Sequence, residues 1–336
     1  MSTSTDRNVL ITGGAGFIGL HLANRLAASG YSVCIADNFS RGMHDKHLQR
    51  FLDHSESSCT AIDLLDETKV LDLGDHFHFI FHLAAIVGVM NVSSQPYSVL
   101  TQNVELLRNV VRLSAQQKNL HRLLFASTSE VYAGTLKHFD LPIPTPEQVP
   151  IGLTSLSEPR TTYMLSKLFG EAMCLQSGLP VTIFRPHNIY GPRMGMAHVI
   201  PEQLNKIYRT KSGQQISVAS VDHTRAFCYV TDAVVMLEEM MKAEACAGKI
   251  LNLGCEHPEI SIQDLVGICL EVTEADRRIV PLPPTTGSPV RRAPDMTLTH
   301  SCLRARPKVG LHEGIRHTWD WYLAHDFSGL EEHTDT

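Results

Sequence analysis

Apolar and polar residues alternate along the first half of the chain in a pattern that predicts strands and helices in turn. Short apolar runs rich in β-branched residues predict buried strands, and amphipathic runs between them predict helices. The predicted strands are 9–11, 32–36, 59–62, 77–83, 123–127 and 181–184, and the predicted helices are 20–28, a polar stretch to about 54, 66–73, 96–118 and 161–177. This alternation predicts an α/β fold, with a doubly wound parallel sheet that carries helices on both faces.

The second half of the chain also contains apolar runs that predict strands and amphipathic runs that predict helices, but these runs are shorter. Helices are predicted over 198–210, 261–272 and 312–323, and a further helix is predicted to start at Thr231. Thr231 and Ser261 are the predicted N-caps of their helices. Strands are predicted over 215–219 and 250–253. Residues 136–159 contain five prolines and predict a loop over the functional site, whereas residues 331–336 predict a loose tail.

Glycines separate the first predicted strand from the first predicted helix, at positions 13, 14, 16 and 19. Glycine accepts a positive φ and lets a backbone approach a ligand closely. The N-terminus of the helix that follows attracts phosphate. Asp37 ends the second predicted strand, about where a carboxylate would bond ribose hydroxyls. The stretch therefore predicts a dinucleotide site, and the simpler alternative is a tight turn with a capping acid.

Tyr163 and Lys167 lie four residues apart on one predicted helix, so that the phenol and the ammonium share a face. A nearby cation, together with the positive nicotinamide of a bound cofactor, would stabilise a phenolate and lower the pKa of the tyrosine. Such a tyrosine can take a proton from a sugar hydroxyl, and Thr128 supplies a hydroxyl that can bond the reacting oxygen. A tyrosine and a lysine at this spacing often have only a structural role. Here they follow the glycine stretch, which favours a catalytic role.

Composition narrows the class of protein. The chain has 336 residues, 43% of them hydrophobic, and a formal charge of −6. No basic run or long apolar run stands out, so we expect no nucleic-acid partner and no membrane partner. The eight cysteines form no CxxC pair and predict reduced thiols in a cytoplasmic protein. The histidines lack metal-ligand spacing, so no metal site is expected.

At this point the chain resembles the extended short-chain dehydrogenase/reductases that act on nucleotide sugars. The residues that carry the resemblance are Thr12–Gly19, Asp37-Asn38, Asp63-Leu64, His82–Ala85, Asn103, Ser127–Glu130, Tyr163–Lys167, Arg185–Pro192, Arg225–Val230, Asn252–Gly254 and Arg291–Asp295. They occur in the family's order over nearly the whole chain.

The resemblance implies a Rossmann-type domain that holds NAD and a smaller C-terminal substrate-binding α/β domain. We expect residues 1–180 mainly in the first, with further sheet segments from about 181–190 and 225–255, and residues 191–330 mainly in the second. It also implies a homodimer that packs through the helices near 96–118 and 161–177.

The resemblance assigns roles to single residues. The expected catalytic residues are Thr128, Tyr163 and Lys167, together with Glu130. The expected cofactor-binding residues are Gly13, Gly16, Phe17, Ile18, Gly19, Asp37, Asn38, Asp63, Leu64, Leu83, Ala84, Ala85, Asn103, Tyr163 and Lys167. The expected substrate-binding residues are Thr128, Ser129, Glu130, Asn188, Arg193, Arg225 and Arg292. Asp37 favours NAD over NADP, and Arg41 slightly weakens that preference.

The sequence leaves the reaction open. Members of the family first oxidise a sugar carbon, usually C4, and the ketone then leads to an epimer, a decarboxylated sugar or a dehydrated sugar. Glu130 can act as an acid or base at C5 or C6, and UDP-glucuronate decarboxylases share the Thr-Ser-Glu run and the Arg-x-Pro motif at Arg292. We expect a 4-epimerase or a decarboxylase of a UDP-sugar. The alternatives are a 4,6- or 5,6-dehydratase and, more distantly, a non-catalytic NAD-binding scaffold.

Overall fold

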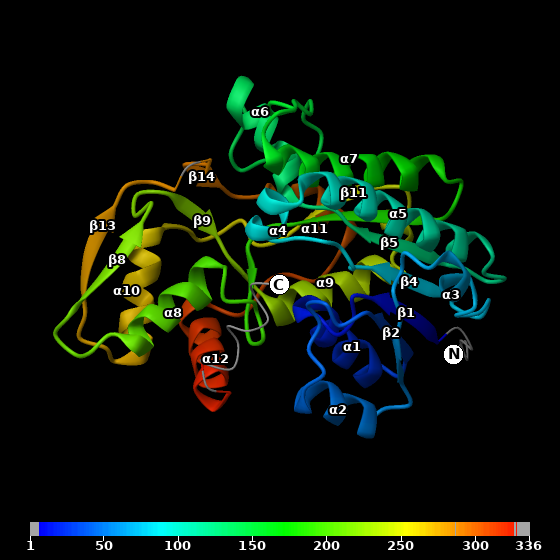
Figure 1. Cartoon of the computed structure of the whole chain (residues 1–336), viewed down its shortest axis with the longest axis horizontal. Coiled ribbons are helices and arrows are strands. Elements are labelled where there is room, and N and C mark those ends of the chain that lie inside the picture. The colour runs from blue at the N-terminus through cyan, green and yellow to red at the C-terminus, as the bar shows by residue number, and fades with distance from the viewer. Residues whose placement is uncertain (1–6, 286, 326, 328–336) are drawn as a thin grey trace.

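The computed structural model describes residues 7–285, 287–325 and 327. The predicted tail at 331–336 lies outside the described residues. Figure 1 shows an elongated molecule in which a large sheet flanked by helices lies beside a smaller region.

A seven-stranded parallel sheet forms the larger region, in the order β11-β6-β5-β4-β1-β2-β3. Its strands are β1 (Asn8–Thr12), β2 (Ser32–Asp37), β3 (Ser58–Ala61), β4 (Phe79–His82), β5 (Arg122–Ala126), β6 (Val181–Pro186) and β11 (Ile250–Leu253). The strand order reverses between β1 and β4, where such sheets bind ligands beyond the carboxyl ends of their strands. The predicted α/β fold class is confirmed.

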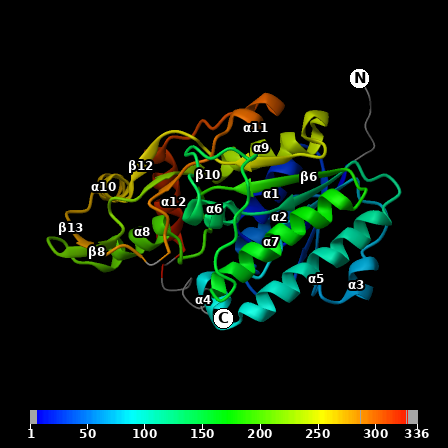
Figure 2. The same cartoon turned by 90° about the horizontal axis from the view of Figure 1, so that it is seen from above.

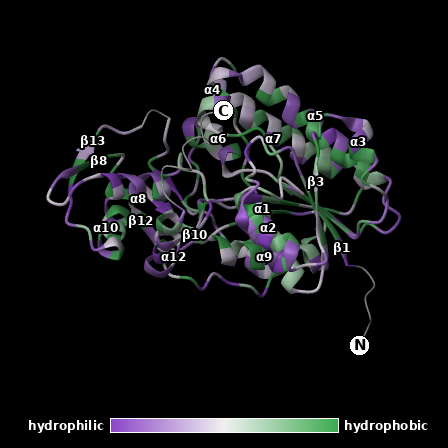
Figure 3. Cartoon of the chain, turned by 60° about the horizontal axis from the view of Figure 1, so that its bottom comes forward, coloured by the Kyte–Doolittle hydropathy of each residue, from purple (hydrophilic) through white to green (hydrophobic). Residues whose placement is uncertain are grey.

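Helices cover both faces of this sheet (Figure 2). One face carries α3 (Glu67–Leu71), α5 (Pro96–Ala115) and α7 (Pro159–Gln176), and the other carries α1 (Phe17–Ala28), α2 (Lys46–Asp53) and α9 (Val230–Lys242). Neighbouring residues of β1 pack into different cores, because Val9 and Ile11 join one cluster and Leu10 joins the other. A strand buried on both faces reads as an unbroken apolar run, which explains the sequence pattern. Figure 3 shows the hydrophobic residues concentrated in these strands.

The smaller region has its own core. It contains α8 (Val199–Arg209), α10 (Ile262–Thr273) and α12 (Leu311–Ala324), with the parallel pair β8 (Gln215–Ala219) and β13 (Arg278–Leu282). A second small sheet has the order β12 (Glu259–Ser261), β9 (Thr224–Ala226), β14 (Arg291–Arg292). The remaining elements are α4 (Val89–Ser94), η1 (Ser129–Tyr132), α6 (Ala133–His138), β7 (Ile189–Tyr190), β10 (Cys228–Tyr229), η2 (Glu244–Cys246) and α11 (Thr297–Cys302).

The structure tests two predicted helix N-caps. Ser261 caps α10 as predicted, since its hydroxyl accepts a hydrogen bond from the backbone N–H of Asp264 at 3.0 Å. Thr231 is not an N-cap, because α9 begins one residue earlier and Tyr229 holds that position without a side-chain bond. Asp232 in the first turn instead accepts hydrogen bonds from the backbone N–H groups of Lys308 and Val309, both at 2.9 Å. These bonds tie the start of α9 to the chain before α12.

Three further findings concern the protein's environment. Within the described ranges, no helix has both the length and the hydropathy needed to cross a bilayer. All eight cysteines are free thiols. Among the described residues, no group of three or more His, Cys, Asp or Glu side chains is placed to hold a metal ion.

Candidate active site

The turn from β1 into α1 forms a cradle that only glycine can build. Gly13 has a φ of +71°, and a Cβ there would lie 2.7 Å from the backbone N of Ala84. A Cβ on Gly19 would collide with the carbonyl oxygen of Gly13. Gly16 holds the N-cap position of α1, so the first N–H groups of the helix face the same space. The close backbone approach and the helix N-terminus fit a dinucleotide diphosphate.

Asp37 lies beside this cradle at the end of β2 and is 7% exposed. Its carboxylate accepts hydrogen bonds from the backbone N–H of Ala15 at 3.0 Å and of Phe39 at 2.9 Å. Burial raises the pKa of Asp37, and these two bonds oppose the rise. The carboxylate is therefore fixed in orientation at the point where an adenosine ribose would lie.

Two adjoining cavities of about 320 and 300 Å³ extend from the cradle. Arg41 lines both of them and donates a hydrogen bond to the carbonyl of Val87 at 3.3 Å. Predicted cofactor residues that line one or both cavities are Gly13, Gly16, Phe17, Ile18, Gly19, Asp37, Asn38, Leu64, Leu83, Ala84 and Ala85. The described residues thus form a continuous groove along the carboxyl ends of β1, β2 and β4.

Four predicted cofactor residues lie outside the lining of both cavities: Asp63, Asn103, Tyr163 and Lys167. Asp63 is exposed, lies outside the lining of both cavities, and accepts a hydrogen bond from the N–H of Leu65. Asn103 is buried, and its amide bonds the N–H of Ile86 at 2.7 Å and the carbonyl of Ile86 at 3.0 Å. Asn103 therefore secures the loop after β4 from behind, because its polar atoms are already used by the backbone.

Tyr163 and Lys167 project from α7 toward the end of β5. The Thr128 hydroxyl forms a hydrogen bond with Tyr163, and the Lys167 ammonium lies 5.9 Å from the Tyr163 ring centroid. Lys167 donates to the carbonyl of Ala126 at 2.8 Å, and burial lowers its pKa to about 8. The structure thus brings together the three residues predicted as a catalytic set.

The pKa of Tyr163 differs from the sequence-based expectation. In the protein alone it is raised, first by burial and then by the carboxylate of Glu130, whereas the Thr128 hydrogen bond and Arg41 lower it. The cation at Lys167 is 4% exposed and is bonded to a backbone carbonyl, so it does not offset the burial. A lowered pKa at Tyr163 would require further positive charge in the groove.

Glu130 lies at the mouth of a separate cavity of about 340 Å³. Its carboxylate is 3.4 Å from the Arg160 guanidinium. Arg292 is close to both: burial and the charge of Arg160 lower its pKa, while Glu130 raises it. Ser129, Glu130, Arg160 and Arg292 line the cavity together with Met164 and His187. Two cations and one anion therefore meet beside the Tyr163 side chain.

Arg160 was missed at the sequence level, although a signal for it exists. It precedes Tyr163 by three residues on α7, and residues three apart share a helix face. A search for charged residues one turn before the tyrosine would have found it.

A buried polar network fixes the short helix η1 that carries Glu130. The Ser127 hydroxyl donates to Glu171 at 2.5 Å, and Arg185 donates to the two carboxylate oxygens of Glu171 at 2.8 and 2.7 Å. Arg185 also donates to the Tyr132 hydroxyl at 2.9 Å. The network therefore holds both ends of η1, and bidentate ion pairs of this kind fix geometry well.

Two predicted substrate residues, Asn188 and Arg225, form hydrogen bonds with backbone carbonyls in this structure. Asn188 has a φ of +42° and donates to the carbonyl of Ala226 at 2.9 Å. Arg225 donates to the carbonyls of Thr224, Val290 and Pro289 and to the Ser288 hydroxyl. It thereby holds a segment of the cavity wall, since Ser288 and Pro289 line the cavity beside Glu130.

Arg193 lies far from that cavity and contacts the glycine cradle. Its guanidinium pairs with Asp45 at 2.8 Å and donates to the carbonyls of Ala15, Gly16 and Met43. Arg193 lines the cofactor groove and not the cavity beside Glu130, and its predicted contact with substrate stays a prediction.

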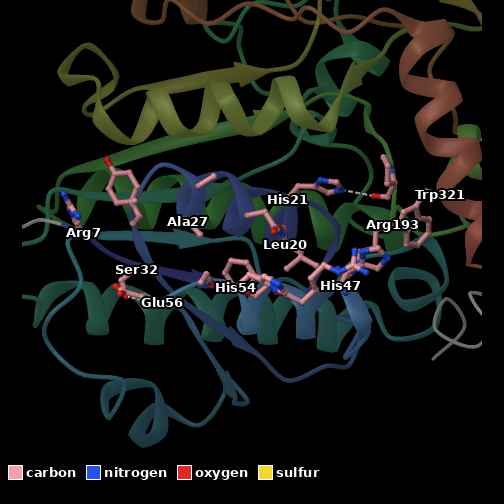
Figure 4. A pocket seen from close by; sticks show the side chains of 18 residues that line it. Arg7, Leu20, His21, Ala27, Ser32, His47, His54, Glu56, Arg193 and Trp321 are labelled. Atoms are coloured by element: carbon pink, nitrogen blue, oxygen red, sulfur yellow. Dashed lines mark hydrogen bonds between the residues drawn. The ribbon is translucent and has the colours of Figure 1, made fainter.

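A larger hollow of about 800 Å³ lies on the outer side of the sheet, between α1 and α2 (Figure 4). His21, His47, Arg193 and Trp321 gather at one end of it, and Arg7, Ser32 and Glu56 lie toward the other. Its lining includes neither Tyr163 nor Glu130. Glu130 lines the cavity of about 340 Å³ instead, and Tyr163 lies near enough to Glu130 for that carboxylate to raise its pKa.

Known proteins resemble this chain over nearly its full length. A UDP-N-acetyl-alpha-D-glucosaminuronate decarboxylase from Bacillus cytotoxicus is 34% identical over 94% of this chain and 98% of its own. A UDP-glucuronic acid decarboxylase 1 from Xenopus tropicalis is 31% identical over 96% of this chain and 73% of its own. Among solved structures, a UDP-glucose 4-epimerase from Thermotoga maritima is similar with a TM-score of 0.81 and 26% identity, covering 95% of this chain and 99% of that one.

The model of one protein family matches residues 9–254, which begin in β1 and end one residue after β11. The family is described as the NAD dependent epimerase/dehydratase family. The resemblance and the cofactor inferred from the sequence are thereby confirmed. This chain belongs to the NAD-dependent epimerase/dehydratase family, and it is an NAD-dependent enzyme.

Proposed function

We propose that the protein decarboxylates a nucleotide-linked hexuronic acid, a UDP-hexuronate, through a ketone at C4 of the sugar. One observation carries this choice among the family's reactions: Arg160 and Arg292 converge with Glu130 beside Tyr163. Among the described charged residues that line the cavity, Lys137 is paired with Glu158 and Arg291 with Glu259, which leaves Arg160 and Arg292 facing Glu130 alone. A second carboxylate, that of a hexuronate, would balance these two cations. The decarboxylase names of the relatives described above support the same choice.

The groove at the glycine cradle is proposed to hold NAD. Gly13, Gly16 and Gly19 leave space for the diphosphate, and Asp37 faces the adenosine ribose. Bound NAD would supply the acceptor for the hydride that leaves C4 and the donor that later returns it. The fixed carboxylate of Asp37 would repel a 2′-phosphate, which favours NAD over NADP.

Tyr163 is proposed to take the proton of the C4 hydroxyl. Thr128 bonds Tyr163 and can share the reacting oxygen, so both hydroxyl groups approach one substrate atom. Lys167 lies 5.9 Å from the ring centroid of Tyr163 and adds positive charge near the phenol. The phenol starts neutral because burial raises its pKa, and it becomes a base only as positive charge collects around it.

The arginines act on the second step. A ketone at C4 is β to the C6 carboxylate, so the C5–C6 bond can break with its electron pair delocalised onto the ketone oxygen. CO₂ leaves, and the resulting enolate oxygen remains within reach of Tyr163 and Thr128. We assign binding of the departing carboxylate to Arg160 and Arg292. Glu130 then lies on the side from which C5 is reprotonated.

Product analysis with labelled substrate tests the proposal. UDP-glucuronate and UDP-N-acetylglucosaminuronate carrying ¹³C at C6 are incubated with enzyme and NAD and followed by NMR. We expect the label to appear as CO₂ and bicarbonate, with a new pentose anomeric signal. A new anomeric signal with the C6 label retained in the sugar would contradict decarboxylation and identify a 4-epimerase.

Arg160→Met and Lys137→Met form a matched pair for this assay. Both side chains line the same cavity and pair with a glutamate, Glu130 and Glu158 respectively. We expect Arg160→Met to raise KM for the hexuronate about tenfold, the scale of one charge-assisted contact. Lys137→Met should leave KM nearly unchanged. Equal effects would mean that Arg160 has no specific part in binding the carboxylate.

The assembly and the compartment belong to the same proposal. Tyr97 on α5 and Phe169 on α7 are 78% and 55% exposed, and these two helices pack side by side. A second copy of the chain placed on this face would cover both rings, so we propose a homodimer through α5 and α7. The eight free thiols support a reducing, cytoplasmic compartment.

A further inference from the structure

The chain crosses from the large sheet into the smaller region through residues 187–193, and this crossover has unusual backbone. Asn188, Gly191 and Arg193 all have positive φ, at +42°, +153° and +71°. Non-glycine residues rarely adopt such angles unless their surroundings hold them there. Arg193 is 6% exposed, so its conformation is set by buried contacts.

Those contacts are hydrogen bonds to two segments of the cofactor groove. The guanidinium donates to the carbonyls of Ala15 at 2.8 Å and Gly16 at 3.1 Å, both within the glycine cradle. It also donates to the carbonyl of Met43 at 2.9 Å and to the Asp45 carboxylate at 2.8 Å. Four of the five N–H donors are therefore engaged, which leaves little capacity for a substrate phosphate.

The position of these bonds bears on anion binding. The C=O of one residue and the N–H of the next point to opposite sides of a trans peptide. Fixing the Gly16 carbonyl therefore fixes the direction of the Phe17 N–H, the first N–H of α1. Arg193 lines both the outer hollow, where Figure 4 labels it, and the cofactor groove. His21 bonds the neighbouring carbonyl of Pro192 at 3.0 Å, so the crossover is held at two points.

We propose that Arg193 is a positioning residue for the cofactor. From the crossover into the smaller region, it holds the glycine cradle and the 43–45 loop in the arrangement that accepts a dinucleotide diphosphate. NAD affinity then depends on Arg193, whereas affinity for the nucleotide part of the substrate does not. The inference rests on the proposed placement of NAD at the cradle.

Calorimetry on cofactor-free enzyme tests this with NAD and, separately, with UDP. For Arg193→Met we expect the Kd for NAD to rise about tenfold or more, while the Kd for UDP changes less than about twofold. Saturating NAD should restore kcat. Arg193→Lys should be intermediate, because it keeps a charge for Asp45 and loses most of the carbonyl contacts.

Two further variants separate positioning from general stability. Arg25→Met removes another ion pair of α1, the 2.5 Å contact with Glu238, without touching the cradle, and it should leave the Kd for NAD unchanged. Asp45→Asn keeps one oxygen for the N-cap of α2 but replaces the oxygen that accepts from Arg193 with an amide NH₂, so it should fold and weaken NAD binding.

The outcomes are distinct. An unchanged Kd for NAD in Arg193→Met and Arg193→Lys, or an equal loss of NAD and UDP affinity, would overturn the positioning role. If Arg193→Met does not fold, the lysine and Asp45→Asn variants decide the same question. If the wild-type protein binds NAD but Gly13→Ala does not affect it, the proposed cofactor placement fails instead.

Discussion

The cofactor groove and the substrate cavity lie side by side but are built from different parts of the chain. The groove is made mostly of backbone, since its shape depends on glycines and on the N-terminus of one helix. The cavity beside Glu130 is made of side chains from η1, α7 and β14, which are far apart in sequence. A backbone site tolerates little change in its own residues, whereas a side-chain site can alter its substrate through single substitutions.

The largest expected effect comes from Tyr163, whose phenol is acted on by Glu130 of the substrate cavity and by Arg41 of the cofactor groove. Tyr163→Phe removes the proton acceptor without changing the ring, so we expect kcat to fall by a factor of about 10²–10⁴. The Kd for NAD should stay close to that of the wild type. Stopped turnover with intact NAD binding is measured by NMR and calorimetry on the same sample. Retained turnover would remove Tyr163 from its catalytic role.

A smaller effect is expected from the backbone-built groove. Gly13→Ala places a Cβ 2.7 Å from the N of Ala84 and forces an alanine to a φ of +71°. The strain of about 1–3 kcal/mol corresponds to a loss of NAD affinity of roughly ten- to hundredfold. Gly30→Ala is the control, because Gly30 also has a positive φ but its Cβ would meet nothing within 4 Å. Equal effects on NAD binding would show that general strain, not the cradle, matters.

Glu130, a carboxylate that lines the substrate cavity, is expected to influence the pH dependence of turnover. Glu130 raises the pKa of Tyr163, so Glu130→Gln should lower that pKa. If the tyrosine acts as a base, the rising limb of the pH–rate profile then moves to lower pH, while kcat at the optimum falls about tenfold. Profiles of kcat against pH for both proteins give the answer. A rising limb at the same pH in both proteins would mean that Glu130 does not influence the pKa of Tyr163.

A separate effect, on stability and not on turnover, concerns one buried histidine of each region. His82 bonds the Thr12 hydroxyl behind the groove, and His187 lines the cavity; burial lowers the pKa of both to about 3. Their stabilising contribution is complete above an unfolded pKa of about 6.5 and is lost as the pH falls toward 3, by about 2 kcal/mol each at pH 5. Chemical unfolding at pH 7.5 and pH 5 should show a smaller loss in His82→Gln and His187→Phe. If the variants lose as much stability between pH 7.5 and pH 5 as the wild type does, the two histidines have ordinary pKa values in the folded protein.

The same contrast explains which parts the sequence could predict. The strand, glycine turn and helix at residues 8–28 form one local unit, and its geometry follows from residue types alone. Tyr163, Lys167 and Thr128 were also predicted together, because the helical spacing and the end of β5 are local patterns. Strands of two residues, such as β7 and β14, are too short to show any periodicity.

Polar residues whose roles depend on the fold were harder to assign. Asn103 and Arg193 were expected at ligands, and in this structure their side chains bind the backbone of the groove. The sequence shows that a side chain has donors, but only the fold shows whether a ligand or a carbonyl receives them. Arg160 illustrates the reverse case, since its partner Glu130 is thirty residues away in the sequence.

The order of strands in the large sheet has a consequence for synthesis on the ribosome. Its edge strand β11 ends at Leu253, after a long excursion of the chain through the smaller region. Until that residue has left the exit tunnel, β6 presents an unpaired edge to other nascent chains. Translation must therefore pass Leu253 before the NAD-binding sheet can close, and a truncated product that stops earlier carries an open strand that invites aggregation.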